Sequence, residues 1–122
     1  MKQRTIKVLP MMLGAIFLAA FPVFGNPQGS KMSVKGEVVD LWCYSQEGAH
    51  GPAHRQCGMT CARLGNPIGI VDAEGNIYVA MGAKDHQPGR ALLLDKMSQT
   101  VTVTGTLVEK GGLKLLYIST VK

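Results

Sequence analysis

The chain has 122 residues, of which 17% are charged, and a formal net charge of +5. Lys2, Arg4 and Lys7 carry three of these positive charges, so the rest of the chain carries only +2. That remainder has no basic stretch with interleaved aromatic residues, which argues against nucleic acid as a partner. The length allows one small domain, near the limit at which an apolar core alone gives stability.

The N-terminal 25 residues are typical of a signal peptide. A basic start is followed by an uncharged apolar run, Val8–Phe24, and by modest or small residues ahead of Asn26, where we expect cleavage. A retained membrane anchor is the alternative, but the run is short for a span and contains Pro10 and Pro22. We therefore expect residues 1–25 to be removed, and the mature form to be periplasmic or extracellular and not membrane-spanning.

Residues 26–32 read as a polar, flexible leader, and residues 33–122 as a single domain. The first expected strand is Ser33–Tyr44, in which side chains alternate between two faces. Gly36 marks a bend or bulge in that strand. This prediction places Cys43 at the end of the strand.

One helix is predicted after this strand. Ser45–Gly51 is read as a loop, and Pro52 suits the first helical position, where its missing N–H costs nothing. The helix is expected over Ala53–Leu64, and Gly65-Asn66-Pro67 ends it.

Four further strands are predicted. Ile68–Asp72 and Ile77–Met81 are apolar, β-branched segments joined by a hairpin signal. Gln99–Lys110 and Leu113–Val121 form a second hairpin around a Gly-Gly turn. Ala91–Leu94 is ambiguous between a short helix and an extended segment.

These elements predict a mainly β domain with five strands and one short helix after the first strand. Closure into a small barrel would bury the apolar face that a single open sheet leaves exposed. The bent first strand and the final hairpin VTVTGTLVEKGGLKLLYISTV resemble an OB-fold. OB-folds usually carry their helix between strands three and four, so the resemblance implies an OB-like barrel.

The predicted helix carries a pattern of metal ligands. His54, Cys57 and Cys61 are spaced i, i+3 and i+7, so they share one helical face. Cys43 is separated from them by a loop long enough to fold back over that face. The four residues make a Cys3His set, which suits zinc or Cu(I).

Three other residues are weaker candidates for this site. His50 and His86 are possible accessory ligands. Asp40 is a candidate for orienting an imidazole from outside the ligand set through a hydrogen bond.

A disulfide is the main alternative to a metal. Cys43 bridged to Cys57 or Cys61 would staple the strand to the helix and leave one thiol free. The protein would then be a disulfide-stapled envelope module without active chemistry. A third interpretation is a thiol–disulfide redox or sensing protein that works through Cys57 and Cys61.

The run C-x13-C-x3-C, with H-x-x-C-x-x-x-C and a Gly-Asn-Pro stop, resembles a set of small, uncharacterised exported bacterial domains. Its matching positions are Cys43, His54, Cys57, Cys61, Gly65 and Pro67. The resemblance implies a recurring cysteine–histidine motif and gives no activity. We expect a small exported metal-binding module, not itself catalytic, whose partner is a metal ion. Another exported or membrane protein is a further candidate partner.

Overall fold

The computed structural model describes residues 29–122. The predicted signal peptide, 1–25, lies outside the described residues, as do residues 26–28 of the predicted leader, 26–32. The last three residues of that leader, 30–32, belong to the first strand. No helix in the described part is long and apolar enough to cross a membrane.

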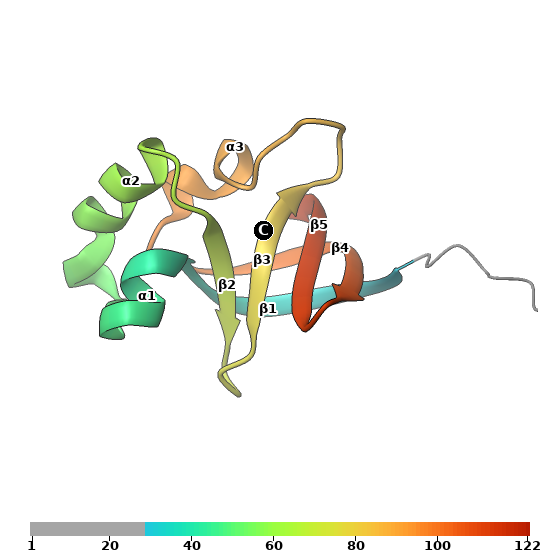
Figure 1. Ribbon diagram of the computed structural model, residues 1–122, viewed down its shortest axis with the longest axis horizontal. Coiled ribbons are helices and arrows are strands. Elements are labelled where there is room, and N and C mark those ends of the chain that lie inside the picture. Colours follow the sequence, from blue (N-terminus) through green and yellow to red (C-terminus); the bar gives the residue numbers. More distant parts are fainter. Residues whose placement is uncertain (1–28) are drawn as a thin grey trace, which may run out of the picture.

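The centre of the molecule is a closed barrel of five strands (Figure 1). The strands are β1 (Ser30–Asp40), β2 (Ile68–Asp72), β3 (Ile77–Gly82), β4 (Thr100–Lys110) and β5 (Leu113–Val121). They follow the order β1-β2-β3-β5-β4, and β3 pairs with β5 in parallel while every other neighbouring pair is antiparallel. The predicted fold, a mainly β five-stranded barrel, is confirmed.

The first strand closes the barrel because it pairs along both of its edges. Its N-terminal part pairs with β4 and its C-terminal part with β2, and Gly36 is paired to both, opposite Asp72 and Val101. A Cβ atom at Gly36 would lie 2.4 Å from the carbonyl oxygen of Val71. Glycine therefore lets the two backbones approach where β1 passes from one neighbour to the other. The register continues through this position, so Gly36 is not a bulge.

Apolar side chains from the strands fill the barrel. Leu93 and Met97, from the connection between β3 and β4, belong to the same core. Alternation along the strands places every second side chain inside. The largest fully buried apolar residues are Ile70, Leu93, Met97, Leu116, Ile118, Val38 and Val103. The core is continuous through these residues.

Helical segments fill two of the connections between strands. The β1–β2 connection contains α1 (Leu41–Glu47), a 3-10 turn η1 (Pro52–His54) and α2 (Arg55–Arg63), and Figure 1 shows α1 and α2 at one end of the barrel. The β3–β4 connection contains α3 (Arg90–Leu93) and a second 3-10 turn, η2 (Leu94–Lys96). The sequence predicted one helix, whereas the described residues form three, α1, α2 and α3. A helical segment does lie between the third and fourth strands, as in an OB-fold.

The prediction that the first strand runs to Tyr44 is wrong, because β1 ends at Asp40 and α1 begins at Leu41. The Asp40 side chain caps this helix by accepting a hydrogen bond of 2.9 Å from the Cys43 N–H. At the other end, Gly48 adopts a left-handed conformation (φ 65°) and its N–H bonds to helix carbonyls. The two caps define a short helix where the alternating pattern had suggested continued strand.

Candidate metal centre

The first part of the site is Cys43 on α1. It is the one residue of that helix with a buried side chain, only 3% exposed. Because Asp40 fixes the start of α1, it also fixes the direction in which Cys43 projects. No other side chain of α1 is buried, and Cys43 lies outside the main cluster of core residues.

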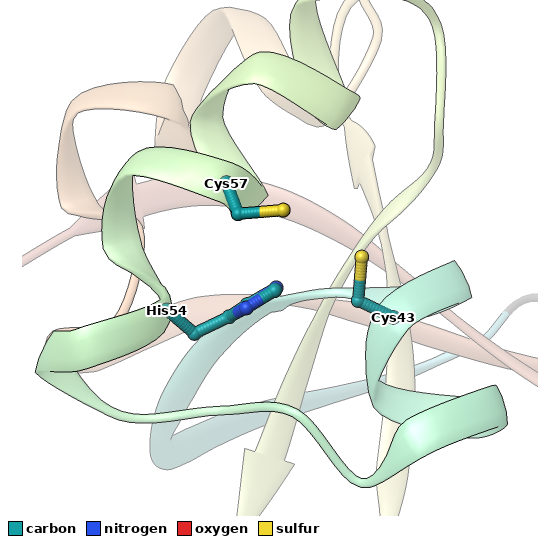
Figure 2. A group of neighbouring side chains, drawn as sticks. All are labelled: Cys43, His54 and Cys57. Atoms are coloured by element: carbon teal, nitrogen blue, oxygen red, sulfur yellow. The ribbon is translucent and has the colours of Figure 1, made fainter.

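The second part of the site comes from η1 and α2. His54 is the last residue of η1 and Cys57 lies in the first turn of α2, so their spacing places them on one side of a continuous helical segment. One ligand atom from each of Cys43, His54 and Cys57 lies within 4.8 Å of the other two. Figure 2 shows the three side chains turned toward one shared space between α1 and the start of α2. We call these three residues the outer trio.

Glu37 on β1 holds the loop that leads to His54. Its carboxylate accepts a hydrogen bond from the Gly51 N–H and lies 3.2 Å from Nδ1 of His50. Gly51 in turn accepts, at its carbonyl, a 3.0 Å hydrogen bond from the His54 N–H. The barrel strand thus anchors the loop between the two helices, and with it the imidazole.

Cys61 lies one helical turn beyond Cys57, and its Sγ atom is 3.9 Å from that of Cys43. Two sulfurs bound to one tetrahedral zinc at about 2.3 Å lie roughly 3.8 Å apart, whereas a disulfide bond is about 2.05 Å long. All three cysteines are free thiols. The Cys43–Cys61 separation is therefore too long for a disulfide and matches the spacing that two ligands of one ion would have. Cys61 also belongs to a second group, the inner trio of Asp40, Cys43 and Cys61, whose ligand atoms lie within 4.8 Å of one another.

Two buried side-chain atoms at this site have no hydrogen-bond partner. They are Nε2 of His54 and Oδ2 of Asp40, and among the described residues no other buried side-chain nitrogen or oxygen is unpartnered. Leaving such an atom unsatisfied costs about 1–3 kcal/mol. A metal ion can bind either atom. Imidazole and thiolate together form a ligand set that zinc and Cu(I) prefer. The residues present fit a metal ion.

The electrostatics of the site favour neutral thiols when no cation is nearby. Burial raises the pKa of Cys43 to about 12, and the neighbouring Asp40 and Cys61 side chains add to the shift. Burial also raises the pKa of Cys61. A bound cation reverses this balance because it stabilises the thiolate directly, so binding would release protons.

Two of the weaker candidates, His50 and His86, lie apart from the cluster. His50 contacts Glu37 and packs edge-on against Tyr44. His86 is almost fully exposed beside Asp85, 3.0 Å away, in the loop after β3. Neither belongs to a metal-sized group in the structure's described part.

Asp40 does not have the role that was predicted for it, which was to orient an imidazole. It makes no hydrogen bond to an imidazole in residues 29–122; it caps α1 and lies against the thiols of Cys43 and Cys61. Sequence reasoning missed this membership of the thiol cluster. The available signal was the Asp-x-x-Cys spacing of a capped helix start.

The four predicted ligands differ in their exposure to solvent. Cys43 is buried, His54 and Cys61 are half-buried, and Cys57 is exposed. Trp42, adjacent to Cys43 in the chain, is 55% exposed. An ion at the outer trio would therefore be reached past Cys57.

No family model, curated protein or solved structure matches the chain. The cluster can hold a metal ion, on its own geometry. The OB-like description likewise depends on the strand order and closure of the barrel.

Proposed function

We propose that the protein is an exported metal-binding module, not itself catalytic, whose Cys43, His54 and Cys57 hold a zinc or Cu(I) ion. Cys61, the fourth residue of the predicted Cys3His set, lies 3.9 Å from Cys43 but groups with Asp40 and Cys43 and not with the outer trio. The observation that carries the proposal is the convergence of the outer trio within 4.8 Å, including a half-buried imidazole whose buried Nε2 atom has no hydrogen-bond partner.

The donor set supports a binding role. The predicted Cys3His set would leave a zinc ion no open position for a substrate or an activated water, and the outer trio provides three of those four ligands. Soft thiolates also accept Cu(I), which is transferred between proteins by exchange of thiolate ligands. Both ions use the same side chains here.

Export and a protein partner are further parts of the proposal. The basic start and apolar run of residues 1–25 support export. Exposure of Cys57, next to a buried Cys43, supports transfer of the ion to or from another exported or membrane protein, because an incoming ligand could approach from that side.

Variant chains test the proposal. The full chain is expressed, recovered from the exported fraction under reducing conditions, loaded with zinc and titrated with a chromophoric chelator. We expect His54→Ala to lose zinc to the chelator at least tenfold more readily than wild type, since one ligand is gone. His86→Ala, which removes an exposed histidine outside the cluster, should match wild type. Equal behaviour of His54→Ala and wild type, or no bound zinc in wild type, would contradict the proposal.

A thiol–disulfide role is the second candidate. The sequence assigned this role to Cys57 and Cys61, whereas the two thiols that lie 3.9 Å apart are those of Cys43 and Cys61. In that reaction the two thiols lose two protons and two electrons and form one S–S bond, while a disulfide oxidant is cleaved to two thiols. Rotation of the side chains would have to close the remaining gap. Protein treated with an oxidised dithiol reagent should then lose roughly 2 Da and keep one alkylatable thiol. Resistance of all three thiols to such oxidation would exclude this role.

A further inference from the structure

We propose that the cluster holds two metal ions, with the sulfur of Cys43 bridging them. The outer ion is bound by the outer trio, Cys43, His54 and Cys57, and the inner ion by the inner trio, Asp40, Cys43 and Cys61. This inference builds on the proposed metal-binding function and assigns Asp40 as a ligand. Cys43 is the residue that the two trios share.

Asp40 provides the first argument. Its side chain is completely buried, with 0% exposure, and only Oδ1 has a partner, the Cys43 N–H. The other oxygen, Oδ2, has none. A buried carboxylate oxygen without a partner is costly, and buried charges are normally paired or bound to metals. An ion at the outer trio does not provide that partner, because Asp40 belongs to the inner trio alone.

The chemistry of the inner trio provides the second argument. Two thiolates and a carboxylate are all common zinc ligands, at bond lengths of about 2.0–2.3 Å. A carboxylate is a hard ligand that soft Cu(I) does not favour. The inner position therefore suits zinc, and water would complete its coordination. A thiolate sulfur has enough lone pairs to bind two such ions at once, as Cys43 would do.

Charge provides the third argument. Three thiolates and one carboxylate carry four negative charges, whereas His54 binds a metal as the neutral imidazole. One divalent ion at the outer trio is balanced by the thiolates of Cys43 and Cys57 and leaves the charge of the fully buried Asp40 carboxylate uncompensated, which is unfavourable. Two divalent ions neutralise the set. The composition of the two trios therefore matches two zinc ions better than one.

Zinc stoichiometry tests the inference. The full chain is recovered from the exported fraction, reduced, loaded with zinc alone and measured by native mass spectrometry. We expect two zinc ions in wild type and one in Asp40→Asn. Asparagine keeps an oxygen that can cap α1 but lacks the charge and is a poor zinc ligand. Asp85→Asn, which changes a carboxylate 91% exposed in the loop after β3, should keep two.

The outcomes separate the two proposals. One zinc in wild type and one in Asp40→Asn would overturn the second position and leave the proposed function standing. No zinc in wild type would overturn both. If Asp40→Asn does not fold, cadmium NMR of the wild-type protein decides: two resonances support the two positions, and a single resonance from cadmium-saturated protein overturns them.

Discussion

The sulfur atoms of Cys43 and Cys61 lie 3.9 Å apart although they come from different helices, α1 and α2. The helices are brought together at one end of the barrel, α1 by its cap at Asp40 and α2 by packing on the segment before β4. Gly58 allows this packing, since a Cβ there would lie 2.9 Å from Sδ of Met97. The thiol pair thus depends on contacts that the barrel core supplies.

The cap at Asp40 should contribute to stability without metal. Replacing a capping Asp with Ala typically costs about 1 kcal/mol of unfolding free energy, whereas Asn is an equally good cap. We therefore expect metal-free Asp40→Ala to be about 1 kcal/mol less stable than metal-free Asp40→Asn in urea unfolding. Equal stability of the two variants would mean that the hydrogen bond to the Cys43 N–H contributes nothing.

Gly36 should tolerate no side chain. A Cβ atom would lie 2.4 Å from the Val71 carbonyl oxygen, and backbone must move to relieve that contact. Gly36→Ala should lower the unfolding free energy by about 2 kcal/mol in the same urea measurement. Lys35→Ala, at the adjacent exposed position, is the control and should change it by less than about 0.5 kcal/mol. An unchanged unfolding free energy in Gly36→Ala would contradict the close pairing of β1 with β2.

Zinc affinity should fall as the pH falls. Burial raises the pKa of Cys43 to about 12, so this thiol is protonated at neutral pH in the metal-free protein and must release its proton to bind zinc. Each proton released changes the apparent affinity by about tenfold per pH unit. Chelator competition at several pH values near neutrality measures the slope. An affinity independent of pH would show that the thiols do not bind the ion.

Glu37 should influence metal affinity from outside the cluster. Its carboxylate accepts a hydrogen bond from the Gly51 N–H, and the Gly51 carbonyl accepts one from the His54 N–H. Glu37→Ala should weaken zinc binding about tenfold, as expected when a group that orients a ligand is lost. His50→Ala removes the other partner of Glu37 but leaves the bond to Gly51, so it should have a smaller effect. An effect of His50→Ala as large as that of Glu37→Ala would contradict this explanation.

Much of the barrel could be predicted because its strands alternate and its turns have specific residues. The prediction for β2, Ile68–Asp72, is correct at both ends, and β5, Leu113–Val121, is correct as well. The end of β1 was wrong because apolar alternation continues through Leu41 and Cys43, while the decisive signals are the caps at Asp40 and Gly48. Local periodicity and capping conflict there, and capping prevails.

The candidate site was partly predictable for the same reason. Helical spacing correctly placed His54 beside Cys57, because a spacing of three residues brings side chains together in any helical turn. The meeting of Asp40 with Cys61 depends on how α2 packs against the start of α1, which no spacing along the chain encodes. Metal binding itself stays a prediction.

The central claim is that the cysteines bind metal, and the mass of the intact protein tests it most directly. The full chain is expressed, the mature protein is recovered from the exported fraction without added reductant, and its native and denatured masses are compared. We expect a native mass excess that matches zinc or copper and is lost on denaturation, with all three thiols then open to alkylation. No excess, a denatured mass roughly 2 Da low and a single alkylatable thiol would contradict the claim and establish a disulfide.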